Sequence, residues 1–158
     1  MSELPVYRAT IDPAWIDYNG HLRDAYYGLV ASLAIDDVMD YLGLDAAYRA
    51  RTHSTLYTLE VHLHYLHEVK SSDDLAVASS ILDFDRKRIH VGCRFSCSRV
   101  SEPVATAEMM LLHVQQGEKV RVVPFPDEVA GKLAALQVSP EVREAFGPGS
   151  RAIQLKRR

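Results

Sequence analysis

The sequence predicts an α+β domain in which one long helix is wrapped by a bent antiparallel sheet of about five strands. The first observation is a long stretch, residues 25–42, whose apolar residues recur at helical spacing. The second is a change to alternating apolar and polar residues from residue 55 onward. The third is the shortness of the links between the later strand-like segments, as antiparallel neighbours require. A bent sheet of this kind can bury its apolar face around a single helix.

Composition bounds the class of protein. A chain of 158 residues fits one domain and can bury roughly 70% of its unfolded surface. The net charge of −3 argues against a nucleic-acid binder that works by neutralising phosphates. No apolar run approaches the roughly 20 residues that span a bilayer, and the first residues lead into no signal-peptide core, so we expect a cytoplasmic protein. Cys93 and Cys97 lie too far apart along one strand for an easy disulfide and are interpreted as packing thiols.

The first part of the chain contains a short strand and the long helix. The strand spans residues 6–11, and Pro13 breaks the chain after it. The helix ends at Gly43, a natural C-cap, and residues 44–51 fit one further short helix. The apolar positions of the long helix are Tyr26, Leu29, Val30, Leu33, Val38, Tyr41 and Leu42.

Strands fill the middle of the chain. Apolar residues at the odd positions from Tyr57 to Tyr65 alternate with polar residues, which predicts an uninterrupted apolar face long enough to cover the helix. The later elements are predicted as strands over 74–85, 87–99 and 103–115 and as a helix over 129–136.

These elements are expected to form one domain over residues 1–138, followed by a mobile tail over 139–158. A sheet with so few strands has open edges, which are a liability for aggregation. Pairing of such edges in a homodimer or a dimer of dimers would cover them.

The segment DYNGHLRDAYY, residues 17–27, is the strongest candidate for a functional site. Asp17 precedes a tight Asn19-Gly20 turn, and Asp24 is placed to cap the helix. One carboxylate would then lie beside the positive end of a helix dipole and its unpaired N–H groups. Such a place can polarise a carbonyl oxygen while an acid or base acts on the carbon. An ordinary loop with an N-cap explains the turn, but not why Asp17, His21 and two tyrosines crowd the same few residues.

Longer motifs give the chain a family resemblance. The blocks are DPAWIDYNGHLRDAYY (12–27), LYTLEVHLHYLHEVK (56–70), DRKRIHV (85–91) and MLLHV (110–114). With them the chain resembles hotdog-fold acyl-CoA thioesterases of the 4-hydroxybenzoyl-CoA thioesterase type. It is more closely similar to the betainyl-CoA thioesterases of bacterial carnitine breakdown.

The resemblance implies a hotdog fold, a homo-oligomer and a thioester hydrolase that needs no cofactor, because coenzyme A is part of its substrate. It assigns Asp17 the position of the catalytic carboxylate and places the carbonyl-polarising N–H near Asp24. His21 stands where the 4-hydroxybenzoyl enzymes have an apolar residue, which leaves the division of labour between Asp17 and His21 open. The expected reaction is hydrolysis of betainyl-CoA to glycine betaine and coenzyme A. The alternatives are a thioesterase for another short acyl-CoA and a non-catalytic hotdog module that binds acyl-CoA.

Glu60 is a second candidate carboxylate. Strict alternation makes it a solvated strand residue, but one bulge would turn it inward, where it could act as a base or attract a cation. His62 and His64 share its parity, yet no further ligand pattern supports a metal. The candidate catalytic residues are Asp17, Asn19, His21, Asp24 and Glu60.

The remaining candidates concern substrate binding. A trimethylammonium group offers no hydrogen bond, so an aromatic cage is the expected device for it. The aromatic residues available near the motif are Trp15, Tyr18, Tyr26, Tyr27, Tyr57 and Tyr65. The basic turn Arg86-Lys87-Arg88 is either a solvated turn or a contact for coenzyme A phosphates, and Lys119 and Arg121 are further candidates for such contacts.

Overall fold

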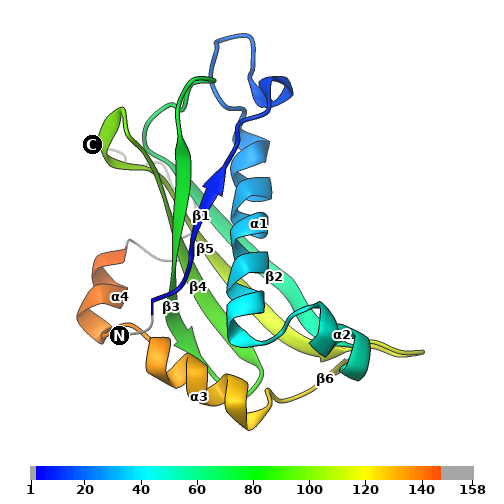
Figure 1. Cartoon of the computed structure of the whole chain (residues 1–158). Coiled ribbons are helices and arrows are strands. Elements are labelled where there is room, and N and C mark those ends of the chain that lie inside the picture. Colours follow the sequence, from blue (N-terminus) through cyan, green and yellow to red (C-terminus); the bar gives the residue numbers. More distant parts are fainter. Residues whose placement is uncertain (1–2, 147–158) are drawn as a thin grey trace, which may run out of the picture.

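The computed structural model describes residues 3–146, which form one curled antiparallel sheet with helices (Figure 1). The strand order is β1 (Val6–Ala9), β3 (Leu75–Phe84), β4 (Arg88–Cys97), β5 (Val100–Gln115) and β2 (Ser54–Tyr65). The short β6 (Arg121–Val122) pairs with the end of β5. Within the described residues the sheet therefore has six strands, five of which correspond to those predicted.

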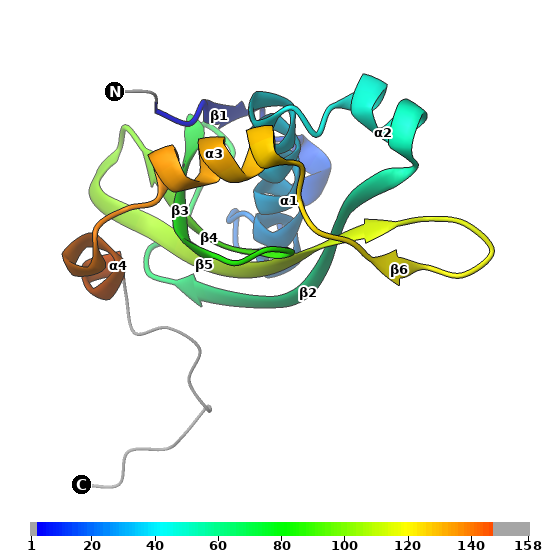
Figure 2. The same ribbon diagram turned by 90° about the horizontal axis from the view of Figure 1, so that it is seen from below.

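The long helix α1 (Asp24–Leu42) lies along the concave face of this sheet (Figures 1 and 2). Its buried residues recur at helical spacing and include Val30, Ala34 and Leu42. They pack with fully buried strand residues such as Ile89 and Phe95. Gly43 ends the helix with a φ of 88°, a left-handed conformation that suits glycine, and its N–H bonds the Asp40 carbonyl. The predicted central helix and its C-cap are confirmed.

The predicted cap at the start of α1 is wrong. Arg23 occupies the N-cap position and makes no side-chain capping bond, while Asp24 is already the first helical residue. The Asp24 carboxylate accepts a hydrogen bond from the N–H of Ala25 at 2.9 Å. No hydrogen bond joins the Asp24 N–H to another described residue, so the helix begins with an available amide donor.

A bulge interrupts β2 and overturns the prediction of an uninterrupted apolar face. The pairing with β5 shifts register between Thr58 and Glu60, which leaves Leu59 as the extra residue. Leu63 packs against the core, whereas Leu59 and Val61 are 55% and 42% exposed. The middle of this edge strand therefore presents apolar side chains to solvent.

Two shorter helices lie toward the end of the molecule where α1 ends (Figure 1). Asp45 caps α2 (Ala46–Thr52) by accepting the Tyr48 N–H at 2.8 Å. The helix α3 (Asp127–Leu136) buries Leu133. No helix of the described part of the chain is long and apolar enough to cross a membrane. Both cysteines are buried and unpaired, in agreement with the interpretation as packing thiols.

Helix α4 (Pro140–Phe146) extends the packed structure beyond the boundary predicted at residue 138. Phe146 lies on Gly92 of β4, where a Cβ atom would come within 2.6 Å of the ring. Asp83 accepts a hydrogen bond from Arg143 at 2.6 Å and one from Gln137 at 3.1 Å. The rest of the predicted tail, residues 147–158, lies outside the described residues.

Candidate active site

The turn at Asp17–His21 holds the Asp17 carboxylate in place. The Asp17 N–H donates to the His21 carbonyl at 2.8 Å, and the Gly20 N–H donates to the Asp17 carbonyl at 3.0 Å. Gly20 has a φ of 77°, which favours glycine. The Asp17 Oδ1 accepts the backbone N–H groups of Asn19 at 2.8 Å and of His21 at 3.1 Å. Hydrogen bonds to the charged form, above all from the His21 amide, lower the pKa of Asp17, so its carboxyl is anionic at neutral pH.

Backbone bonds fasten this turn to the start of α1. The Leu22 N–H donates to the Val69 carbonyl at 2.7 Å, and the Arg23 N–H donates to the Trp15 carbonyl at 2.9 Å. The short 3-10 helix η1 (Pro13–Trp15) precedes the turn and is capped by Asp12. The turn is therefore held between η1 and the segment that follows β2.

A cleft of about 520 Å³ lies at this end of the molecule, and we call it the Asp17 cleft. It combines carboxylates, the start of α1 and tyrosine side chains. Its lining residues are Asp17, Tyr18, His21, Leu22, Arg23, Asp24, Tyr27, Tyr65, Leu66, His67 and Glu68.

Three of the predicted aromatic residues line the cleft. Tyr27 is 3% exposed and meets Tyr65 edge to face, with ring centroids 5.2 Å apart. The Tyr65 hydroxyl donates to the Asp24 carbonyl at 3.2 Å, and Tyr18 lies exposed at the rim. Burial raises the pKa of Tyr27 to about 12, so its phenol stays protonated.

The other aromatic candidates have different places. Trp15 and Tyr26 stack on one another with centroids 5.2 Å apart and do not line the cleft. The Tyr57 hydroxyl accepts a hydrogen bond from Gln116 at 3.1 Å, beside the start of β2. Trp15 and Tyr26 pack against the core, and none of these three rings lines the Asp17 cleft of its own chain.

Glu60 does not lie in the Asp17 cleft of its own chain. Its side chain is exposed and bonds the His62 Nε2 at 2.7 Å. The bulge falls just before Glu60 without turning it into the core.

Among the described residues no cluster of histidine, cysteine and carboxylate side chains suits a metal ion. Asn19 contributes its backbone N–H to Asp17, not a side-chain contact with the cleft.

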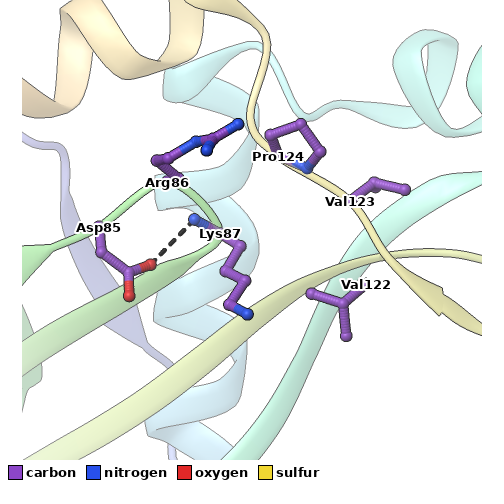
Figure 3. Close-up of a pocket in the computed structure, with 6 residues that line it drawn as sticks. All are labelled: Asp85, Arg86, Lys87, Val122, Val123 and Pro124. Carbon is purple, nitrogen blue, oxygen red and sulfur yellow. Dashed lines mark hydrogen bonds between the residues drawn. The ribbon is translucent and has the colours of Figure 1, made fainter.

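The basic turn between β3 and β4 lies at the opposite end of the sheet from the start of α1 (Figure 1). Arg86 and Lys87 line a hollow of about 340 Å³ there (Figure 3). Val122, Val123 and Pro124 form its other side. Arg88 instead pairs with the Asp85 carboxylate through its Nε at 2.8 Å. The structure therefore separates these cations from the Asp17 cleft within one chain.

Five residues that line the cleft are not among the candidates that the sequence predicts: Leu22, Arg23, Leu66, His67 and Glu68. Glu68 supplies a third carboxylate, and Arg99 holds the Glu68 backbone by donating to its carbonyl oxygen at 2.7 Å. The two residues are 31 positions apart, so only the pairing of the strands brings them together. The block 56–70 contains Glu68, but nothing in that pattern distinguishes it from an exposed turn residue.

This arrangement suits attack on a carbonyl carbon. The amide and dipole at the start of α1 can stabilise a developing oxyanion. The Asp17 carboxylate can attack the carbon directly or activate a water molecule.

Comparison with known proteins agrees with this chemistry. The chain belongs to the thioesterase-like superfamily, whose family model matches residues 11–133. Its curled sheet around α1 is the predicted hotdog fold.

Individual relatives narrow the comparison. A betainyl-CoA thioesterase of Pseudomonas aeruginosa is 42% identical over 133 residues, which cover 84% of this chain and 83% of the relative. The crystal structure of a candidate thioesterase from Pseudomonas putida KT2440 is 40% identical, with a TM-score of 0.80 and 99% of each chain covered. A Staphylococcus aureus protein in complex with CoA is 28% identical, with a TM-score of 0.81 and 94% of each chain covered.

Proposed function

We propose that this chain hydrolyses betainyl-CoA to glycine betaine and coenzyme A. The observation that carries the proposal is the Asp17 cleft, in which a fixed carboxylate, an available amide and tyrosine side chains converge. The 42% identity to the Pseudomonas aeruginosa betainyl-CoA thioesterase supports this choice of acyl group.

In the proposed reaction the thioester carbonyl oxygen points at the Asp24 N–H. As a general base, Asp17 takes a proton from water while the water oxygen bonds to the carbonyl carbon. As a nucleophile, Asp17 forms a mixed anhydride that water then hydrolyses. On either route the C–S bond breaks, coenzyme A leaves and takes up a proton, and the acyl group leaves as a carboxylate.

The cleft also suits the cation of this substrate. The trimethylammonium group lies one carbon from the thioester carbonyl, so its binding site must be close to Asp17. Tyrosine faces attract such a cation, and the anionic side chains of Asp17 and Glu68 add long-range attraction. The cation also withdraws electrons from the carbonyl, which makes the thioester easier to hydrolyse.

Thiol release across a panel of acyl-CoAs tests the proposed function. We expect betainyl-CoA to give the highest specificity constant among short acyl-CoAs. Preference for another member would establish a different thioesterase. Binding of acyl-CoA without thiol release would establish a non-catalytic module, for which a carboxylate beside the oxyanion site has no purpose.

We further propose that the enzyme works as a homodimer, or a dimer of dimers, in the cytoplasm without a cofactor. The two buried thiols suit a reducing compartment. The dimer would place the free edge of β2 against a second copy, because this edge is long and carries exposed Leu59 and Val61.

Arg86 and Lys87 remain proposed contacts for coenzyme A phosphates. Because the hollow that they line lies far from the Asp17 cleft in one chain, we propose that one substrate contacts the Asp17 cleft of one subunit and these cations of the other.

Sedimentation at micromolar concentration tests the dimer. We expect the wild-type protein to sediment as a dimer or tetramer and the double variant Leu59→Lys/Val61→Lys to sediment as a monomer, because two charges would face the partner strand. Val142→Lys on α4 is the control, since Val142 is exposed to a similar degree on another element. A wild-type monomer, or a double variant that associates like the control, would contradict the proposed interface.

A further inference from the structure

Glu68 lies in the segment between β2 and β3 and lines the Asp17 cleft. The backbone here is well fixed. The N–H groups of Leu66 and His67 both donate to the Val104 carbonyl at 3.0 Å. Arg99 donates to the Glu68 carbonyl at 2.7 Å. The backbone position of Glu68 is therefore set by β5 and by the link that precedes it.

The charge of Arg99 is directed mainly at another carboxylate. Its Nε and Nη2 atoms donate to Asp73 at 3.0 and 2.9 Å, and the Asp73 side chain is only 4% exposed. The Glu68 Oε1 lies 3.9 Å from the Arg99 Nη1, at the limit of an ion pair. Glu68 is thus held by its backbone, while its side chain is 49% exposed and makes only a long contact with Arg99, which contributes little in water.

The other two carboxylates of the cleft have different partners. Asp17 Oδ1 already accepts two turn amides, and Asp24 Oδ1 accepts the Ala25 N–H at the start of the helix. No hydrogen bond from another described side chain engages the Glu68 carboxylate. Hydrogen bonding from its own amide, together with the charges of Arg99, His21 and Lys70, lowers the pKa of Glu68. Glu68 is therefore an anion in the cleft with no role in holding the turn or the helix.

We infer that Glu68 is the specificity-determining residue that recognises the quaternary ammonium group of the substrate, in the same cleft as the reacting carboxylate Asp17. This inference rests on the proposed function and goes beyond it by dividing the work between two carboxylates. Asp17 acts on the carbonyl carbon. Glu68 attracts the cation, which lies one carbon from the thioester carbonyl, and exchanges no proton with the substrate.

The test compares Glu68→Gln with the wild type on two substrates of equal shape. They are betainyl-CoA and its neutral isostere 3,3-dimethylbutyryl-CoA. For betainyl-CoA we expect kcat/KM to fall roughly tenfold or more, chiefly through KM, because a charge close to the cation is lost. For the neutral substrate kcat and KM should stay within about twofold. The control is Glu128→Gln, which removes an exposed charge from α3 at the other end of the sheet.

Several outcomes would overturn the inference. An equal loss of kcat on both substrates would make Glu68 an acid or base, and an unchanged preference would leave it no role in recognition. Glu68→Asp, which keeps the charge, should retain more of the preference than Glu68→Gln, and this comparison stands even if one variant is less stable. A wild type that does not prefer betainyl-CoA would refute the proposed function itself. If the wild type prefers betainyl-CoA and Glu68→Gln keeps the same preference, only the assignment of Glu68 would be refuted.

Discussion

Replacement of Asp17 by asparagine is expected to lower kcat by roughly two orders of magnitude or more while leaving the fold intact. The reason for the intact fold is geometric. An asparagine Oδ1 can still accept the N–H groups of Asn19 and His21, so the turn keeps its hydrogen bonds. What is lost is the negative charge that, in the proposed reaction, attacks the carbonyl carbon or activates water. Thiol release measures kcat, and thermal unfolding checks the fold.

Asp12→Asn provides a matched control for this substitution. Asp12 Oδ1 likewise accepts a backbone N–H, that of Ala14 at 2.8 Å, but the residue does not line the cleft. Its replacement should leave kcat within a few-fold of the wild type. If Asp17→Asn behaved in the same way, the chemistry would have to be reassigned to His21, Glu60 or Glu68.

The second large effect concerns substrate charge. Betainyl-CoA should be hydrolysed with a specificity constant roughly thirtyfold or more above that of neutral 3,3-dimethylbutyryl-CoA. A single cation–π contact in a desolvated site contributes about 2 kcal/mol, equivalent to this factor in binding. Tyr65, which is 51% exposed, offers a ring surface in the cleft that also holds anionic Asp17 and Glu68, so the attraction should exceed that of one ring alone.

Steady-state thiol release with the two substrates gives this ratio directly. Because they have the same shape, differences in steric fit cancel. Equal specificity constants would refute a cation-selective cleft and leave a general short-chain thioesterase.

Most of the fold was predictable from the periodicity of apolar residues, because in a long helix or strand a few residues that break the pattern do not hide it. The alternation after residue 55 and the helical spacing over 25–42 both correspond to real elements. The bulge at Leu59 was not visible in this pattern, since an extra residue changes the pairing without changing residue type. The predicted cap failed for a related reason. Asp24 has a favourable residue type for a cap, but the chain enters the helix one residue earlier.

The candidate site divides in the same way between local and distant signals. Asp17, His21 and Asp24 come from one short segment, so the sequence alone could place them together. Glu68 and its partner Arg99 meet only through strand pairing. Outside the candidate site, Phe146 meets Gly92 only through the path of α4. His113 is a similar case. It is buried, with its Nε2 3.0 Å from the Tyr48 hydroxyl, in a contact 65 positions apart along the chain.

The most direct test of the central claim is a crystal structure of Asp17→Asn with unhydrolysed betainyl-CoA bound. The Asp17 cleft should hold the acyl group, with the thioester carbonyl oxygen within hydrogen-bonding distance of the Asp24 N–H. The quaternary nitrogen should lie between Glu68 and the ring of Tyr65. An acyl group bound elsewhere, for example in the hollow beside Arg86 and Lys87, would contradict the account.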